Sequence, residues 1–281
     1  MTKKVAVIND LSGFGRCSLT AAIPVLSVMG VQPCPLPTAV LSAQTGYPDY
    51  YCDDYTDRME YFRSQWEKMG VSFDGIYTGF VASEEQIRNI FHFLDTFYKE
   101  DTFLLVDPVM GDDGEVYDMF TPELCRLMKQ LVWKADVITP NLTELCLLTG
   151  EDYEELHALT DKEDLIVSLR EPVDRMRKAG PDTVIVTGLH YMEEDTLMMG
   201  NLAVTEQEVC LIGNPKIGGS YSGTGDLFAS VVAGGIAKGL ALGEILQKAS
   251  DFINASIAAS PQTPGYHADG AEFEQCLGVL L

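Results

Sequence analysis

Short apolar segments recur along this chain, and each one ends in a polar turn. Residues 103–106 (FLLV) run directly into an aspartate, residues 137–138 into a threonine and a proline, and residues 183–186 into a threonine and a glycine. Segments in which apolar residues recur at helical spacing separate these strands. Strands that alternate with helices form a largely parallel sheet whose two faces are covered. The chain is therefore predicted to fold as an α/β protein.

The other elements are inferred from the same periodicities and from turn and cap residues. Strands are expected at residues 5–8, 33–41 and 75–80, a hairpin within 198–212, and helices at 18–29, at 55–69, after a Ser83–Gln86 cap and from residue 142. The acidic stretch 151–165 is interpreted as a solvated surface without chemistry. Because no repeat or linker divides the chain, residues 1–281 are expected to form a single domain.

The composition restricts the partners of the protein. A net charge of −23 over 281 residues argues against a nucleic-acid surface and against an anionic membrane. It leaves ATP open, because local amides and a divalent cation can hold a nucleotide. The first apolar run has only four residues, too few for a signal peptide, and no later run approaches a membrane span.

The cysteines point to a reducing compartment, and neither the cysteines nor the histidines have the spacing of a metal site. The seven cysteines include no CxxC pair, which fits buried thiols in the cytoplasm better than disulfides or a zinc site. The four histidines lack the spacing of metal ligands, and each is expected to be a surface or core residue: His92, His157, His190 and His267.

A glycine-rich stretch before a helix is the candidate active centre. Residues 218–225 contain four glycines, and the apolar spacing after them is helical. The amides of Gly223, Thr224 and Gly225, together with the positive end of the helix dipole, would form a site for a phosphate or a developing oxyanion. Asp226 has two interpretations: an acid stabilised by the dipole, or a general base in phosphoryl transfer.

Several motifs together resemble the pyridoxal kinases of the ribokinase-like superfamily. In chain order they are PTAV at 37–40, SAQTGY at 42–47, DPVMGD at 107–112, TPNLTEL at 139–145, PDTVIVTG at 181–188 and GTGD at 223–226. They cover most of the chain, and their order and spacing make the resemblance specific. It implies a ribokinase-like three-layer α/β/α sandwich with a mostly parallel central sheet flanked by helices.

The resemblance also implies a reaction and its residues. The expected reaction moves the γ-phosphoryl group of Mg-ATP onto the hydroxymethyl group of a B6 vitamer, with Asp226 as the base and Gly223, Thr224 and Gly225 as the anion hole. On the nucleotide side the resemblance implies two acids around Mg²⁺ and three further contacts: Asp107 and Glu144, and then Asp112, Asn141 and Thr187. For the vitamer end it implies Asp10, Ser12, Thr45, Gly46 and Phe80. It further implies a homodimer, and it leaves open a monovalent cation such as K⁺.

The chain departs from the family pattern on the vitamer side. Where the family carries Ser-His-Val-Val and then Gly-Asn, this chain has DLSG at 10–13 and Ser18-Leu19, and Ser-Asn-His-Thr is replaced by SAQT at 42–45. These departures bear on the choice of substrate more than on the reaction. An acid at position 10 could accept a hydrogen bond from a ring N–H or an amine, which would favour pyridoxamine.

Other functions remain open. A hydroxymethylpyrimidine kinase shares the fold, the GTGD loop and a planar substrate with a hydroxymethyl group. A sugar or nucleoside kinase is disfavoured, because the lid of extra strands is not evident between residues 10 and 50. A non-catalytic protein that stores pyridoxal phosphate or ATP is a different class, and it would gain nothing from the carboxylate of Asp226 among phosphate-binding amides.

Overall fold

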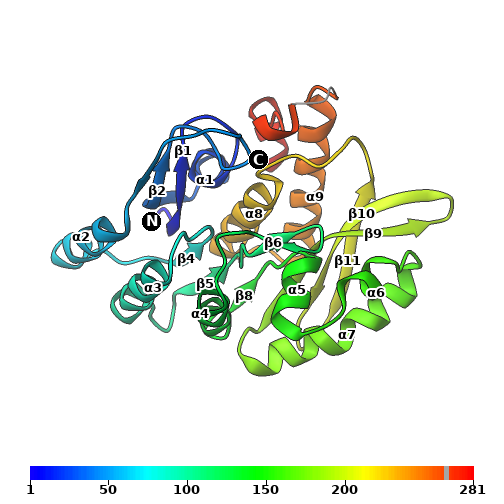
Figure 1. The fold of residues 1–281 in the computed structure, drawn as a ribbon, viewed down its shortest axis with the longest axis horizontal. Helices are drawn as coiled ribbons and strands as arrows, with labels where there is room; N and C mark the ends of the chain where they lie inside the picture. Colours follow the sequence, from blue (N-terminus) through cyan, green and yellow to red (C-terminus); the bar gives the residue numbers. More distant parts are fainter. Residues whose placement is uncertain (263–265) are drawn as a thin grey trace. The chain divides into compact units, whose positions relative to one another are not determined.

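A computed structural model describes residues 1–262 and 266–281 of the protein (Figure 1). The described residues group into two compact units. Unit 1 consists of residues Met1–Leu104 and Ile217–Leu281, and unit 2 of residues Leu105–Lys216. Each unit is a mixture of strands and helices, which confirms the predicted α/β class with a mostly parallel sheet flanked by helices. The expectation of a single domain over residues 1–281 stays a prediction.

The strands of unit 1 are arranged in the order β4 (Gly75–Thr78), β1 (Lys4–Ser12), β2 (Gln32–Leu41) and β3 (Cys52–Asp54). β1 pairs in parallel with both β4 and β2, and only the short β3 is antiparallel. β1 continues beyond the expected end at residue 8, because its pairing with β2 shifts after Asn9 and resumes at Leu11. This irregularity lies among polar residues that the sequence suggests are a loop.

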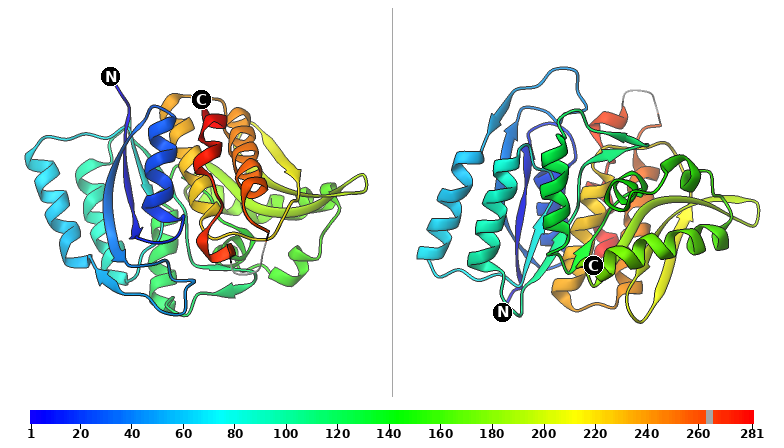
Figure 2. Two further views of the ribbon diagram at one scale, coloured as in Figure 1. Left: turned by 90° about the horizontal axis from the view of Figure 1, so that it is seen from above. Right: turned by 60° about the horizontal axis from the view of Figure 1, so that its bottom comes forward.

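Helices cover both faces of these strands. α2 (Thr56–Lys68) and α3 (Glu84–Phe97) lie on one side of β1 and β2, and α1 (Ser18–Val28), α8 (Thr224–Lys238) and α9 (Leu242–Ala259) on the other (Figure 2). Two 3-10 helices follow, at Tyr266–Asp269 and Glu274–Leu280. The predicted cap of α3 is confirmed, since the Ser83 hydroxyl accepts a hydrogen bond of 3.3 Å from the Gln86 amide.

Unit 2 begins in β5 (Phe103–Val106), which pairs in parallel with β8 (Val137–Ile138), and β8 pairs in parallel with β9 (Thr183–Glu193). The expected hairpin is confirmed: β10 (Thr196–Val204) and β11 (Val209–Pro215) are antiparallel. β9 is much longer than the expected residues 183–186, because its second half pairs with β10. A separate ribbon is formed by β6 (Gly111–Asp112) and β7 (Glu115–Val116).

The helices of unit 2 are α4 (Pro122–Val132), α5 (Leu142–Thr149), α6 (Tyr153–His157) and α7 (Lys162–Ala179). α5 and α7 pack against β9. The acidic segment 151–165, expected to be a solvated surface, contains α6 and the start of α7.

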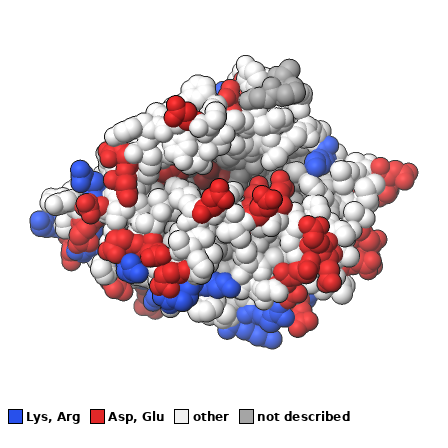
Figure 3. Space-filling view, in the orientation of Figure 1, with Lys and Arg blue, Asp and Glu red and all other residues white. Residues whose placement is uncertain are grey.

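The surface agrees with the charge of the sequence. Acidic side chains are spread over the face shown in Figure 3, and basic ones form small groups among them. Within residues 1–262 and 266–281, no helix has the length and apolar character needed to span a membrane.

Rings from α2, α3 and the segment before β4 form an aromatic cluster in unit 1. Phe93 is 1% exposed and lies within 6.1 Å of three other rings, measured between centroids: Trp66, Phe73 and Phe97. Phe93→Ala should therefore lower the free energy of unfolding by about 3–5 kcal/mol, because it leaves a cavity that rigid rings cannot fill. Urea unfolding measures the loss. The exposed Tyr61→Ala on α2 is the control and should change stability little; equal losses would contradict the packing.

Candidate functional site

The glycine-rich stretch of unit 1 leads into α8 as the sequence predicts. Gly223 is the N-cap of the helix, with a left-handed backbone (φ 79°), and Asp226 lies in the first turn. A Cβ atom on Gly223 would lie 2.0 Å from the carbonyl oxygen of Arg16, whereas one on Gly225 would meet nothing within 4 Å. Glycine is thus required at 223 both for the backbone angle and for the close approach of the 13–16 loop.

The carboxyl group of Asp226 is the perturbed acid of this site. Its Oδ1 accepts a hydrogen bond of 3.0 Å from the Asn9 side chain, and the backbone N–H of Ser18 donates to the same carboxylate. Burial is the largest influence and raises the pKa of Asp226 to about 6; the charge of Asp10 adds to this, and the two hydrogen bonds oppose it. A carboxyl group with this pKa is ionised at neutral pH and is a better proton acceptor than an ordinary aspartate.

Asn9 is a site residue that the sequence reasoning missed. It is completely buried, and besides the bond to Asp226 its Oδ1 accepts hydrogen bonds from the backbone N–H groups of Phe80 (2.9 Å) and Asp10 (3.0 Å). A Cβ atom on Gly79 would lie 2.4 Å from Asn9 Nδ2, so glycine at 79 leaves room for this side chain. Asn9 therefore links the carboxylate of Asp226 to the backbone of a predicted vitamer residue.

Asp10, predicted at the vitamer end, is 5% exposed. Its Oδ2 accepts a hydrogen bond of 2.8 Å from the hydroxyl of Ser12, and its Oδ1 accepts one from the hydroxyl of Ser18. Burial raises the pKa of Asp10, and these hydrogen bonds oppose the rise. The two predicted residues Asp10 and Ser12 therefore contact each other inside unit 1.

The loop after β2 carries two more of the predicted vitamer residues, and the remaining one, Phe80, follows β4 and is partly buried. Thr45 and Gly46 are exposed, and the Gly46 amide donates to Gln44 Oε1 over 2.7 Å. Gln44, which replaces a histidine of the family pattern, is 7% exposed and donates through Nε2 to the carbonyl of Ala268 (2.8 Å). Gln44 thus links this loop by a hydrogen bond to the 3-10 helix at Tyr266–Asp269.

In unit 2, Glu144 and Asn141 form a capping box at the start of α5. Asn141 Oδ1 accepts from the Glu144 amide over 2.8 Å, and Glu144 Oε2 accepts from the Asn141 amide over 2.9 Å. The other Glu144 oxygen accepts from the Met110 amide (3.1 Å). Burial, followed by the charge of Asp107, raises the pKa of Glu144 well above its usual range. Asp107 accepts a hydrogen bond of 3.0 Å from the Thr139 hydroxyl.

Asp107 and Glu144 were assigned to a metal site by the family resemblance. Both are buried carboxyl groups close enough for their charges to interact, and both Glu144 oxygens already accept backbone hydrogen bonds. No cluster of three or more His, Cys, Asp or Glu suited to a metal occurs among the described residues. This set fits Mg²⁺ that keeps its waters and is held mainly by phosphates, rather than an ion caged by protein.

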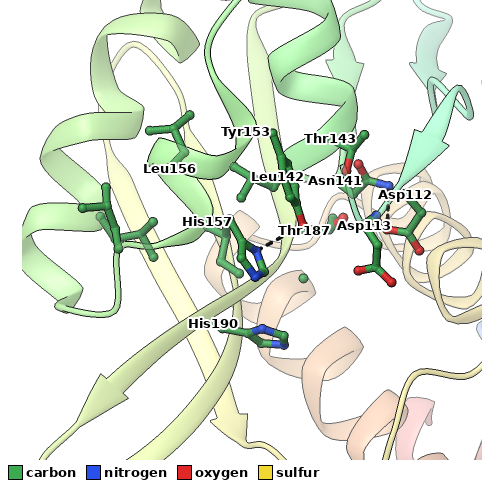
Figure 4. Close-up of a pocket in the computed structure, with 14 residues that line it drawn as sticks. Asp112, Asp113, Asn141, Leu142, Thr143, Tyr153, Leu156, His157, Thr187 and His190 are labelled. Carbon is green, nitrogen blue, oxygen red and sulfur yellow. Dashed lines mark hydrogen bonds between the residues drawn. The ribbon is translucent and has the colours of Figure 1, made fainter. Parts of the chain in front are cut away.

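A pocket of unit 2 brings together three predicted nucleotide residues: Asp112, Asn141 and Thr187 (Figure 4). Asn141 Nδ2 donates to the carbonyl of Gly111 (2.8 Å), which ties the β6–β7 ribbon to α5. Asn141 also forms an isolated parallel bridge with Thr187. The structure thus places these three residues around one cavity.

The same pocket has walls that the sequence reasoning missed. Tyr153 and His157 of α6 line it, their rings stacked with centroids 5.1 Å apart, and His190 of β9 faces it from another side (Figure 4). Burial, followed by the charge of Lys216, lowers the pKa of His190, so its imidazole is neutral at pH 7. The segment 151–165, interpreted above as a surface without chemistry, therefore contributes to a pocket beside predicted nucleotide residues.

Comparisons of the sequence and the fold with known proteins find kinases that phosphorylate small ring compounds. The family model described as phosphomethylpyrimidine kinase matches residues 17–269. A solved structure from Bacteroides thetaiotaomicron, described as a candidate phosphomethylpyrimidine kinase in a form with pyridoxal, is 39% identical, with a TM-score of 0.90 over 100% of this chain and 96% of its own. The pyridoxal kinase of Lactobacillus plantarum is 29% identical, with a TM-score of 0.85 over 100% and 97% of the two chains. A hydroxymethylpyrimidine/phosphomethylpyrimidine kinase of Staphylococcus aureus is 31% identical over 66% of this chain and 63% of its own.

The two glycines of the α8 start give a matched test. Gly223→Ala should lower the free energy of unfolding by more than about 1 kcal/mol, because alanine is strained at positive φ and its methyl group would meet the Arg16 carbonyl. Gly225→Ala should be tolerated, since space is open there. Chemical denaturation of the two variants compares them. Equal losses, or a larger loss at 225, would show that the loop does not have this geometry.

Asp226 should destabilise the fold when it is ionised. The pKa of Asp226 is raised from its ordinary value of 3.8 to about 6 in the folded protein, so protonation of Asp226 favours the folded state. This contribution to the free energy of unfolding is complete below pH 4 and is lost as the pH rises through 6. Asp226→Asn, which stays neutral, should be more stable than the wild type by roughly 1–3 kcal/mol at pH 8, and the gain should shrink as the pH is lowered to 5. Thermal melts at both pH values measure it; a gain independent of pH would contradict the raised pKa.

Proposed function

The chain belongs to the phosphomethylpyrimidine kinase family, and we propose that it transfers the γ-phosphoryl group of ATP to the hydroxymethyl group of a B6 vitamer. The observation that carries this proposal is the Asp226 carboxyl group, hydrogen-bonded to Asn9 in the first turn of a helix whose N-cap is glycine. Burial raises the pKa of this carboxyl group, which agrees with the role of a base. The similarity to a pyridoxal kinase and to a structure that contains pyridoxal supports the choice of substrate.

In this proposal Asp226 accepts the proton of the substrate hydroxyl as the oxygen attacks phosphorus. Gly223, Thr224 and Gly225 supply backbone N–H groups at the positive end of α8, where they stabilise negative charge on the group in transfer. Asn9 and the Ser18 amide hold the carboxylate in one orientation. A pKa near 6 keeps Asp226 ionised at pH 7 while it remains basic enough to accept the proton.

We assign the nucleotide to the residues of unit 2. One pocket is lined by Asn141, Thr187 and Asp112, and these residues would contact ATP. Asp112 belongs to the β6–β7 ribbon beside this pocket. Asp107 and Glu144 would hold Mg²⁺ through water, and the ion, when bound, would neutralise phosphate charge. A monovalent cation such as K⁺ has no assigned ligand in this proposal.

We assign the vitamer to unit 1. Phe80, Thr45 and Gly46 would contact the ring and its substituents, with Asp10 and Ser12 behind them. We further infer that residues 1–281 act as one kinase domain, that the protein is cytoplasmic, and that it forms a homodimer.

A second candidate is the phosphorylation of hydroxymethylpyrimidine. The description of the matched family and the Staphylococcus aureus relative favour it. The departures from the pyridoxal kinase pattern at residues 10–13 and 42–45 lie on the substrate side and are compatible with either ring.

One assay separates these functions. ATP consumption should be stimulated by pyridoxal, pyridoxamine or pyridoxine more than by hydroxymethylpyrimidine, and kcat/KM should fall as the pH drops below about 6, because protonated Asp226 cannot accept a proton. Asp226→Asn should lose about 10²–10⁴-fold in kcat while still binding ATP.

A higher kcat/KM with hydroxymethylpyrimidine would favour the second candidate. Undiminished turnover by Asp226→Asn would remove the base assignment. Binding of pyridoxal phosphate or ATP without any turnover by the wild type would favour a storage protein.

A further inference from the structure

Ser18 has an unusual backbone conformation for its residue type. It is the first residue of α1, and its φ is 50°, in the left-handed region that favours glycine. Among the described residues only two other non-glycine residues have positive φ, Asp113 and Glu194. Such a conformation persists where surrounding contacts hold it.

Two of the contacts that Ser18 makes lead to two different carboxyl groups. Its hydroxyl donates to Oδ1 of Asp10, and its backbone N–H donates to Asp226. Asp10 lies on β1, is 5% exposed, and is fixed from its other side by the Ser12 hydroxyl. A buried anchor on β1 thus determines where the first amide of α1 points.

We propose that Ser18 is a positioning residue for phosphoryl transfer: the bond from its hydroxyl to Asp10 holds it in the left-handed conformation that directs its backbone N–H at the carboxylate of Asp226. This inference rests on the function proposed above. It changes the role of Asp10 from a contact of the vitamer to the anchor of Ser18.

The burial of Asp10 supports this role over recognition of a substrate amine. Both carboxylate oxygens accept serine hydroxyls, and the residue is nearly inaccessible. A vitamer amine would have to displace one of these hydroxyls, and the charge of the amine would have to be desolvated.

Two titratable groups among the described residues interact with the charge of Asp226. Asp10 of β1 raises the pKa of Asp226, and the thiol of Cys17, the N-cap of α1, also lies close to it. Burial, Asp226 and Asp10 raise the pKa of the Cys17 thiol to about 12, so it stays neutral. The Ser18 amide is therefore one of two hydrogen-bond donors, with Asn9, that favour the charged form of the base.

The test compares Ser18→Ala with Ser18→Gly. Alanine loses the anchor and is strained at positive φ, so kcat should fall about 10- to 100-fold, and the acidic limb of the pH profile should move to higher pH. Glycine also loses the hydroxyl but adopts positive φ freely and keeps the N–H, so it should recover most of the activity and the wild-type pH profile. A role in stability alone also favours glycine over alanine at positive φ, but it predicts an acidic limb of the pH profile that stays at the wild-type position in Ser18→Ala.

Glu194 supplies the matched control. It has positive φ (53°) in the turn between β9 and β10 and has no part in the proposed site. Glu194→Ala and Glu194→Gly should leave kcat and the pH profile unchanged. Asp10→Asn keeps an acceptor for the Ser18 hydroxyl and should leave the order of preference among pyridoxal, pyridoxamine and pyridoxine as in the wild type.

A second measurement does not depend on turnover. The ¹H–¹⁵N resonance of the Ser18 amide should titrate with Asp226 in the wild type and in Ser18→Gly, and this titration should be lost in Asp226→Asn and reduced in Ser18→Ala. If the wild type phosphorylates none of the four ring substrates, the proposed function fails and this titration alone decides the inference. Equal activity of Ser18→Ala and Ser18→Gly, an amide that does not follow Asp226, or an altered vitamer ranking in Asp10→Asn would overturn it.

Discussion

A carboxyl group partly withdrawn from water and held by two hydrogen-bond donors is the constraint on which unit 1 depends. Partial burial makes the ionised form of Asp226 unfavourable, because the carboxylate loses hydrating water. The hydrogen bonds that Asn9 and Ser18 donate to it offset part of this desolvation cost. An acid with this balance is ionised near neutral pH and still accepts a proton readily. The balance that makes it suitable as a base also makes it a source of instability, so the site is expected to trade stability for reactivity.

Several local features of unit 1 make room for this carboxyl group and its hydrogen-bond partners. Gly223 allows the 13–16 loop to approach α8, and Gly79 leaves space for Asn9. The irregular pairing of β1 after Asn9 places Asn9 and Asp10 as neighbouring buried polar residues instead of a solvated turn. Each of these polar groups has a partner, as buried polar groups require.

The sequence predicted those parts of the protein that depend on local chemistry. The glycine N-cap of α8, the Ser83 cap and the β10–β11 hairpin all follow from residues close together in the chain. It did not predict the contact of Asn9 with Asp226, because the two residues are 217 positions apart. β1 was expected to end at residue 8, because Asn9 and Asp10 are polar. The strand continues past them because hydrogen-bond partners elsewhere in the chain allow both side chains to be buried. The positive φ of Ser18 and the wall formed by Tyr153 and His157 depend in the same way on distant packing.

The central claim is that Asp226 is a base whose pKa is raised by its surroundings, and its carboxyl carbon reports this directly. A ¹³C NMR titration of the carboxyl resonance, assigned by its absence in Asp226→Asn, should give a midpoint near 6. A midpoint near 4, the ordinary value for a solvated aspartate, would contradict the account.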